Sequence, residues 1–278
     1  MTTLDWINRA READLQVRNV INGKTINVCA DASGTNDPSV ISKHSPRDGS
    51  LLYQFGAGTA DDVNQAVSCA REAFNDGRWS GLLAPQRKAV LKKLVSLIEA
   101  NHEELALLEC LDVGKPIGNA LSQDIPLALG MLNSFVENMD KVLSSAGSDG
   151  GTLSYQARKP VGVVGAIIGW NFPFVLAVLK AGPALAMGNS LVLKPSEFSS
   201  LSAGRLAELA LEAGVPPGVF NVVNGAGATV GDALAKHPDI DLLSFTGSSA
   251  TGKQMMIAAG QSNMKRLLLE CGGKYPFI

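Results

Sequence analysis

The sequence predicts an α/β protein built on a doubly wound parallel sheet, with an N-terminal helical layer and a protruding β segment. Three observations lead to this prediction. Between residues 161 and 245, short apolar runs alternate with stretches of helical spacing. Of the 278 residues, 46% are hydrophobic and 18% are charged, as in ordinary globular domains. Polar and glycine-rich motifs follow the predicted strands directly, where sheets of this class bind ligands.

Composition and charge exclude several classes of partner. The formal charge of −2 predicts no nucleic-acid partner and no attraction to an anionic membrane. The four cysteines form no CxxC pair and the three histidines lie far apart, so no structural metal is expected. The chain has no bilayer-length apolar run and no signal-like N-terminus, which predicts a cytoplasmic protein in a reducing compartment.

The N-terminal part predicts a hairpin followed by helices. Residues 19–28 form the hairpin, with Asn22 and Gly23 in a tight turn. A helix starts at the Thr59 cap and ends at Gly77. Residues 85–110 carry apolar side chains at helical spacing and predict a two-helix layer. A further helix begins near 124 and runs toward 141.

Small and polar residues fill positions 144–159, in the middle of an otherwise helical stretch. This composition predicts an exposed strand or ribbon that leaves the main body. Two interpretations stay open for it: an edge that pairs with another subunit, and a plain surface loop.

The order of elements is regular after Pro160. Strands are predicted at 161–168, 190–194, 219–224 and 242–245, and helices at 174–186 and 202–213. This alternation implies right-handed crossovers, so the strands are parallel. Ligands of such sheets bind at the carboxyl ends of the strands, and the loops there are the candidate site.

The loop Gly-Trp-Asn-Phe-Pro at 169–173 follows the first of these strands. A buried amide without a partner costs about 1–3 kcal/mol, so Asn171 needs a role. It is interpreted either as a donor to an oxyanion or as a helix cap.

The loop Lys-Pro-Ser-Glu at 194–197 follows the next strand. Lys194 and Glu197 could hold ribose hydroxyls, with the carboxylate repelling an added 2′-phosphate. The alternative is a helix start with Ser196 as the cap and Glu197 near the positive end of the helix dipole.

Two glycine-containing loops complete the edge. The glycines at 225, 227 and 231 do not have the spacing of a dinucleotide fingerprint and follow a late strand, so they predict only close backbone approach to a ligand or strand. In the stretch 245–253, Ser248 and the free amides of a helix N-terminus suit a pyrophosphate. Lys253 is followed by Gln254 instead of Ser or Thr, which argues against a nucleoside triphosphatase.

Near the end, Glu270 precedes Cys-Gly-Gly-Lys. The glycines let the backbone approach a ligand closely, so Glu270 is a candidate catalytic carboxylate. On an extended strand neighbouring side chains point to opposite faces, and we therefore expect Cys271 to point away from Glu270.

Taken in this order, the motifs at 169–173, 193–197, 245–249 and 269–274 resemble the aldehyde dehydrogenase superfamily. The resemblance runs over nearly the whole chain, through Leu-Asp-Val-Gly-Lys-Pro at 111–116. Residues 124–126, 140–142 and 262–266 are most similar to bacterial enzymes of ω-amino aldehydes, such as γ-glutamyl-γ-aminobutyraldehyde dehydrogenases. This narrower resemblance implies a role in polyamine catabolism.

The resemblance implies a Rossmann-like NAD-binding domain and the NAD-dependent oxidation of a small-molecule aldehyde to a carboxylic acid. It makes Glu270 the general base, Asn171 an oxyanion donor and Lys180 a helper in proton transfer, unless carbonyls under the sheet satisfy the Lys180 amine. The cofactor-binding residues that it implies are Ile168, Trp170, Lys194, Ser196, Glu197, Gly227, Gly231, Phe245, Gly247, Ser248, Thr251 and Cys271. It also implies a dimeric or tetrameric parent enzyme.

Two departures from the family pattern concern the site. Gly169 stands where the family more often has proline, and Leu179 where an aromatic residue often lines the substrate tunnel. The cysteine nucleophile of the family lies beyond the glutamate, in a catalytic domain, so residues 1–278 are expected to be a fragment without turnover of its own. A free-standing nucleotide-binding or interaction module is the alternative.

The resemblance also implies a division of the chain. Residues 1–143 form the hairpin and helices of the cofactor domain, and 144–160 the protruding oligomerisation segment. Residues 161–270 form the NAD-binding core, and 271–278 begin the catalytic domain.

Overall fold

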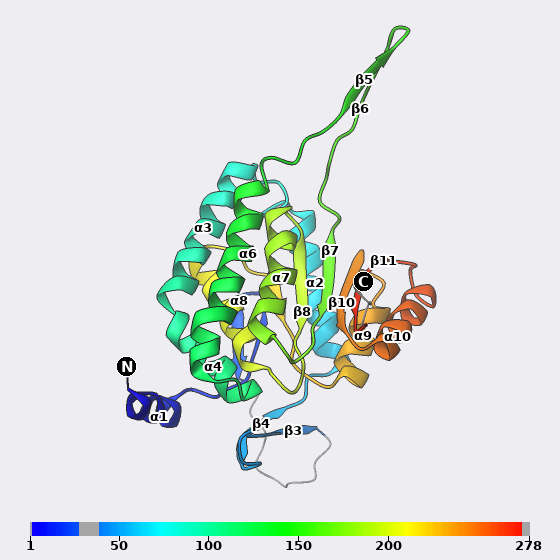
Figure 1. The fold of residues 1–278 in the computed structure, drawn as a ribbon. Coiled ribbons are helices and arrows are strands. Elements are labelled where there is room, and N and C mark those ends of the chain that lie inside the picture. The colour runs from blue at the N-terminus through cyan, green and yellow to red at the C-terminus, as the bar shows by residue number, and fades with distance from the viewer. Residues whose placement is uncertain (1, 28–38, 274–278) are drawn as a thin grey trace, which may run out of the picture.

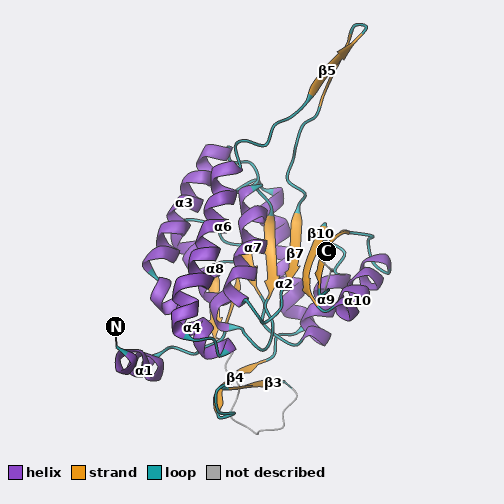
Figure 2. Ribbon diagram, viewed as in Figure 1, coloured by secondary structure: helices purple, strands orange, loops and turns teal. Residues whose placement is uncertain are grey.

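A seven-stranded sheet forms the centre of the molecule in a computed structural model that describes residues 2–27 and 39–273 (Figures 1 and 2). The strand order is β11-β10-β7-β8-β9-β1-β2. The strands from β11 to β9 are parallel to their neighbours, and β1 joins β9 in antiparallel orientation. The strand bounds are β1 Arg18–Ile21, β2 Lys24–Asn27, β7 Val163–Ile167, β8 Ser190–Lys194, β9 Phe220–Val222, β10 Leu242–Gly247 and β11 Arg266–Cys271. The predicted doubly wound parallel sheet is confirmed, and the hairpin adds an antiparallel edge to it.

Helices cover both faces of this sheet (Figure 1). One hydrophobic core joins the sheet to α3 (Ala84–Ala100), α6 (Ile125–Asn138), α7 (Pro173–Ala186) and α8 (Leu201–Ala213). A second core joins the other face to α2 (Ala60–Asn75), α9 (Asp232–Lys236) and α10 (Ser249–Gly260). Every residue of β7 and β8 is buried, as expected for central parallel strands that read as continuous apolar runs.

Several local predictions are confirmed. Asn22 and Gly23 have φ values of 51° and 73°, which a tight hairpin turn requires. Thr59 closes a capping box at the start of α2. The two-helix layer consists of α3 and α4 (His102–Val113). The helix expected near 124 is α6, which follows a π-helical turn, η1 (Ala120–Asp124).

Some elements were not predicted. The strands β3 (Val40–His44) and β4 (Leu51–Gly56) form a separate two-stranded sheet, and their burial does not alternate regularly. A third core cluster holds Tyr53 and Phe55 of β4. The remaining helical elements are α1 (Thr3–Glu12), α5 (Ile117–Asn119) and the π-helical η2 (Gly227–Gly231).

The segment 144–159 forms the hairpin of β5 (Ala146–Asp149) and β6 (Thr152–Tyr155), which projects from the body (Figure 1). All its strand residues are exposed, and Leu153 and Tyr155 expose 72% and 75% of their surface. The predicted ribbon is therefore confirmed. Its apolar side chains are therefore largely open to solvent.

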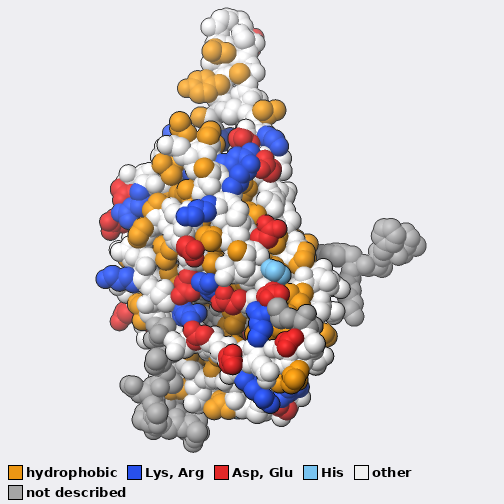
Figure 3. All heavy atoms as spheres, turned by 90° about the vertical axis from the view of Figure 1, so that its left-hand side faces the viewer, with side chains coloured by type: hydrophobic (Ala, Val, Ile, Leu, Met, Phe, Trp, Pro, Cys, Tyr) orange, Lys and Arg blue, Asp and Glu red, His pale blue; other side chains and the backbone are white. Residues whose placement is uncertain are grey.

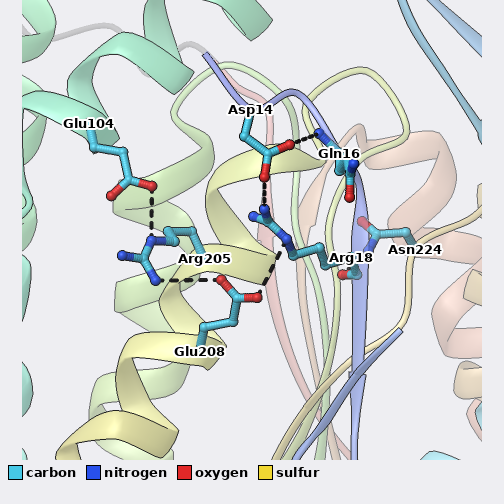
Figure 4. Close-up of polar contacts among 7 residues, drawn as sticks. All are labelled: Asp14, Gln16, Arg18, Glu104, Arg205, Glu208 and Asn224. Carbon is cyan, nitrogen blue, oxygen red and sulfur yellow. Dashed lines mark hydrogen bonds and ion pairs between the residues drawn. The ribbon is translucent and has the colours of Figure 1, made fainter. Parts of the chain in front are cut away.

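A cluster of ion pairs ties the sheet edge to the helical layer (Figure 4). Arg18 of β1 lies 3.5 Å from a carboxylate oxygen of Glu208 in α8. Arg205 of α8 donates to Glu104 of α4 over 2.9 Å. Asn224 holds the backbone of β1 by donating to the Arg18 carbonyl at 2.8 Å. The Arg205–Glu104 ion pair thereby holds helix α4 against α8.

The surface on the α1 and α3 side carries basic and acidic side chains that alternate without a large patch of one sign (Figure 3). Among the described helices, none is both long and apolar enough to cross a membrane. Within the same residues, no three His, Cys, Asp or Glu side chains are grouped as metal ligands.

Candidate active site

The candidate residues meet at the carboxyl edge of the parallel sheet. In the strand register, Ile167 of β7 lies opposite Lys194 of β8 and opposite Phe245 of β10. Thr246 of β10 lies opposite Glu270 of β11. Because these strands are parallel, the loops that follow them emerge on the same side, as the sequence predicted.

Lys194 and Glu197 form an ion pair in the loop after β8. The Lys194 Nζ atom donates to Glu197 Oε2 over 2.8 Å, and the Gly227 amide donates to Glu197 Oε1 over 3.3 Å. Burial lowers the pKa of Lys194, against the opposing effect of Glu197. Burial also raises the pKa of Glu197, but the charge and hydrogen bond of Lys194 outweigh it, so that pKa is lowered overall. The two groups therefore form a charged pair.

The alternative for this loop, a helix start, is wrong. Helix α8 begins at Leu201, and its N-cap residue is Ser200. The Ser196 hydroxyl instead accepts from the Phe198 amide over 3.2 Å, inside the loop. Neither Ser196 nor Glu197 lies in the first turn of the helix, which leaves ribose binding as the prediction for this pair.

The glycine loop at 225–231 brings two backbone segments together. The Gly58 amide donates to the Asn224 carbonyl over 3.0 Å, and a Cβ atom on Gly225 would come within 2.5 Å of Val230. The expected close approach of backbone is thus confirmed. Gly227 and Gly231 differ, since a Cβ on either would meet nothing nearer than 3.8 Å. Neither glycine is therefore required by close packing, although Gly231 is buried and Gly227 is exposed.

The N-terminus of α10 is open toward the same edge. Ser248 caps the helix by accepting from the Thr251 amide over 3.1 Å. The amides of Ser249 and Ala250 precede the first acceptor that a helix provides, so they are available to an anion. A Cβ atom on Gly247 would lie 2.5 Å from the Phe245 ring, which keeps this turn compact.

Glu270 and Cys271 point to opposite sides of β11, as predicted. Glu270 and Leu268 line a cavity on the α7 side of the sheet. The Cys271 thiol faces α10, since its sulfur would lie 2.6 Å from a Cβ atom on Gly252. The side chains of Cys271 and Glu270 therefore lie on opposite faces of the sheet, although the two residues are adjacent in sequence.

Lys180 and Glu270 line one cavity of about 740 Å³. The cavity lies between α7, the strands β10 and β11, and the base of the β5–β6 hairpin, and Leu179 and Ser244 also line it. Lys180 is 7% exposed. Burial lowers the pKa of Lys180, and the nearby charge of Glu270 opposes this. A lysine with a lowered pKa gives up its proton more readily than a solvated lysine does.

Asn171 lies in an exposed loop beside the end of β10. A Cβ atom on Gly169 would lie 3.5 Å from the Asn171 amide oxygen and 3.6 Å from the Thr246 carbonyl. Helix α7 has Phe172 as its N-cap and no side-chain cap, so the interpretation of Asn171 as a cap is wrong. Thr246 lies opposite Glu270, and the Asn171 loop and Glu270 therefore flank the same strand end.

The other predicted cofactor residues are placed as follows. Trp170 is 56% exposed at the edge. Ile168 is buried, and its amide donates to the Lys194 carbonyl over 3.2 Å. Phe245 is buried under the turn that leads to α10, and the Thr251 hydroxyl lies 2.9 Å from that of Ser248.

Two buried carboxyl groups at the site were not predicted. Glu109 Oε1 accepts from the Phe174 amide over 3.2 Å and from the Ser202 hydroxyl over 2.7 Å. Asp112 Oδ2 accepts from the Leu201 amide over 3.1 Å. The signal in the sequence is that both acids share the helix face of Leu105 and Leu108, a face otherwise apolar.

The fold and this polar edge define a doubly wound α/β protein with a ligand site at the ends of its parallel strands. Residues 33–278 match the aldehyde dehydrogenase family. The chain belongs to that family.

Relatives agree with this assignment. The NADP/NAD-dependent aldehyde dehydrogenase PuuC of Escherichia coli is 53% identical over 224 residues, which are 80% of this chain and 45% of that protein. The structure of γ-glutamyl-γ-aminobutyraldehyde dehydrogenase from Burkholderia cenocepacia matches with a TM-score of 0.92 and 45% identity over 98% of this chain and 54% of that one. An indole-3-acetaldehyde dehydrogenase in complex with NAD⁺ matches with a TM-score of 0.91 and 47% identity over 98% of this chain and 54% of that one. The chain spans about half the length of these relatives.

Proposed function

We propose that this chain binds NAD and contributes to the active site of an enzyme that oxidises an aldehyde to a carboxylic acid. The observation that carries the proposal is the gathering at one sheet edge of the Lys194–Glu197 pair, the open N-terminus of α10 and Glu270. Membership of the aldehyde dehydrogenase family and the NAD⁺ complex of one relative support it.

The residues at this edge fit a dinucleotide. Glu197 and Lys194 hold the hydroxyls of the adenosine ribose, and the carboxylate disfavours a 2′-phosphate. The amides at the start of α10, together with Ser248 and Trp170, hold the pyrophosphate, because a helix N-terminus favours negative charge. The exposed backbone at Gly227, whose amide already donates to Glu197, lies beside the ligand, and Gly231 lies below it. Bound NAD⁺ supplies the acceptor for the hydride that leaves the aldehyde carbon.

Other cofactor contacts complete the proposal. Ile168 offers backbone atoms, and Ser196 and Thr251 offer hydroxyls beside the groups named above. Phe245, Gly247 and Cys271 shape the turn and the start of α10 from below.

The proposed chemistry divides three roles among residues of this chain. Glu270 takes a proton from the water whose oxygen attacks the thioester formed on the family's cysteine nucleophile, so that the thiolate leaves and the acid is released. Lys180 exchanges the proton across the shared cavity. The Asn171 amide donates to the oxygen on which negative charge develops. The exposed position of Asn171, free of a capping role, suits a donor to a ligand.

We propose ω-amino aldehydes as the substrate class, with γ-glutamyl-γ-aminobutyraldehyde dehydrogenase among the similar structures in support. The exposed β5–β6 hairpin is proposed to pair with another copy of the chain in a homo-oligomer, since its unpaired strand edges and apolar side chains suit such pairing. The division of the chain at 143, 160 and 270 is part of the same proposal.

Calorimetry of NAD⁺ binding to the purified protein tests the cofactor site. Binding by the wild type and a loss of about tenfold or more in Glu197→Ala are expected. Glu212→Ala, an exposed change on α8, is the matched control and should bind as the wild type does. Equal affinity in Glu197→Ala would remove Glu197 from the site.

A turnover assay tests the catalytic role of Glu270 directly. NADH formation with ω-amino aldehydes that stops in Glu270→Gln supports the catalytic role of Glu270. NAD⁺ binding without aldehyde oxidation is expected of residues 1–278 alone under both possibilities, so mass spectrometry of the native protein separates them: a species about twice this length would exclude the free-standing module.

A further inference from the structure

We propose that Glu109 is a positioning residue that holds the Asn171 loop in place from a neighbouring helix. This inference rests on the proposed function, in which that loop carries Trp170 and Asn171. Glu109 acts by capping α7 from α4, and nothing in the two helices themselves replaces this contact.

Helices α7 and α8 both lack a cap of their own. The N-cap residues are Phe172 for α7 and Ser200 for α8, and neither side chain accepts a hydrogen bond from the first turn. The amides of a first helical turn have no partner inside the helix, so an uncapped buried end is costly. Another part of the chain must supply the acceptors.

Helix α4 supplies an acceptor to each of these ends. Glu109 Oε1 accepts from the amide of Phe174, the second residue of α7, over 3.2 Å. Asp112 Oδ2 accepts from the amide of Leu201, the first residue of α8, over 3.1 Å. The Ser202 hydroxyl donates to the same Glu109 oxygen over 2.7 Å and so joins α8 to the cap of α7. One helix thus holds the ends of both loops that form the proposed cofactor edge.

Three contacts restrain the Asn171 loop, and one of them is the Lys115 Nζ atom, which lies 3.6 Å from the centroid of the Phe172 ring. On the strand side, the Ile168 amide donates to the Lys194 carbonyl, and on the helix side the Phe174 amide donates to Glu109. Between these two points the side chains of Trp170, Asn171 and Phe172 are exposed. Removing the acceptor at Glu109 releases the helix side of the loop.

The surroundings of Glu109 favour its neutral form. The side chain is fully buried and its Oε2 atom has no hydrogen-bond partner in the described part of the chain. Asp112 on the same helix disfavours the charge and Lys115 favours it, while α7 and α8 present only the Phe174 amide and the Ser202 hydroxyl. Burial raises the pKa of Glu109 to about 8. At neutral pH it therefore caps α7 as an acid without a buried charge.

The three tryptophans of the chain give a direct test by fluorine NMR of fluorotryptophan-labelled protein. Trp170 lies in the loop itself. Trp79 donates to the Leu185 carbonyl at the far end of α7 over 2.9 Å, so it reports on the same helix away from the cap. Trp6 lies in α1, and Trp170→Phe assigns the loop resonance.

The variants separate capping from general damage. Glu109→Met has a similar volume but no acceptor, and should shift or broaden the Trp170 resonance while the Trp79 resonance stays in place. Glu109→Gln keeps an acceptor oxygen and should resemble the wild type at neutral pH. Glu104→Gln removes a charge from the same helix without touching α7, and is the control. An unchanged Trp170 resonance in Glu109→Met, or an equal shift of Trp79, would overturn the proposal.

If Glu109→Met does not fold, a pH titration tests whether Glu109 positions the Asn171 loop. Between about pH 6 and pH 9 the wild-type Trp170 resonance should move with a midpoint near the Glu109 pKa of about 8, and in Glu109→Gln it should not. No movement in the wild type, or the same movement in Glu109→Gln, would contradict the role of Glu109.

Calorimetry adds the functional arm. NAD⁺ affinity should fall about tenfold in Glu109→Met and stay within about twofold of the wild type in Glu109→Gln. A wild type that binds no NAD⁺ contradicts the proposed function alone, because the fluorine resonances report on the loop without any ligand.

Discussion

The Nζ atom of Lys194 lies 2.8 Å from the Oε2 atom of Glu197, and the lysine is 2% exposed. The pair lies at the end of β8, where the second oxygen of Glu197 accepts from the Gly227 amide. One carboxylate therefore joins two segments of the proposed cofactor edge, the end of β8 and the loop of Gly227. Substituting Lys194 alone tests what this ion pair contributes to stability and to binding.

Lys194→Met should destabilise the protein by about 1–3 kcal/mol, because it leaves the partly buried Glu197 carboxylate without its partner. It should also weaken NAD⁺ binding. Denaturant unfolding measures the first effect, and Lys236→Met, which breaks an exposed pair with Asp232, is a control expected to cost less than about 1 kcal/mol.

The same pair predicts a pH dependence. The pKa of Glu197 is lowered in the folded protein, so its contribution to stability is complete above the ordinary value of 4.5 and is lost as the pH falls through the folded pKa. In Lys194→Met this acid-side loss should be smaller. An identical acid limb in wild type and variant, measured by unfolding at several pH values, would contradict the assignment.

Glu109 predicts the opposite slope. Its pKa is raised from 4.5 to about 8, so the folded state holds a proton that the unfolded state releases, and stability falls as the pH rises between these values. The loss is at most about 1.4 kcal/mol per pH unit. Asp112 contributes in the same sense only up to its pKa of about 6. Burial also lowers the pKa of His237 from 6.5, so the difference between wild type and Glu109→Gln, and not the wild-type slope alone, reports on Glu109 between about pH 6 and pH 8. In this pH range the free energy of unfolding of Glu109→Gln should vary less with pH than that of the wild type. The free energy of unfolding of Glu104→Gln should vary as the wild type does.

Two glycines of the site should respond differently to alanine. Gly247→Ala places a methyl group 2.5 Å from the buried Phe245 ring and should cost about 1–3 kcal/mol. Gly169→Ala meets nothing nearer than 3.5 Å, and should change the unfolding free energy by less than about 1 kcal/mol in either direction. Thermal and denaturant unfolding compare the two, and equal effects would show that the steric argument fails.

The β5–β6 hairpin predicts a change in assembly. Leu153→Ser with Tyr155→Ser should lower the molar mass in solution if the hairpin pairs copies of the chain, because it removes exposed apolar surface from the projecting ribbon. Light scattering after size-exclusion chromatography measures this. Leu4→Ser, at an apolar residue exposed to 65% on α1, is the control, and an unchanged mass in the hairpin variant would argue against the pairing.

Local sequence was enough to predict much of the fold and one feature of the site. Asn22 and Gly23 suit their turn, Thr59 has its capping partner three residues away, and the strands β7 and β8 are continuous apolar runs. The opposite directions of Glu270 and Cys271 follow from the period of a strand alone. These features depend on neighbours in the chain, and a single sequence contains them.

The sequence by itself determined the class of fold, the order along the chain of the loops that follow the strands, and the residue types that face the ligand edge. The tertiary structure alone decided which groups act on those loops from outside. Glu109 lies 65 residues before Phe174 and Asp112 lies 89 before Leu201, and each caps a helix that does not cap itself. For Asn171 the sequence left two interpretations open, an oxyanion donor and a helix cap, and the structure excludes the cap. A buried hydrogen bond between distant segments depends on how helices pack, and no local pattern records its partner.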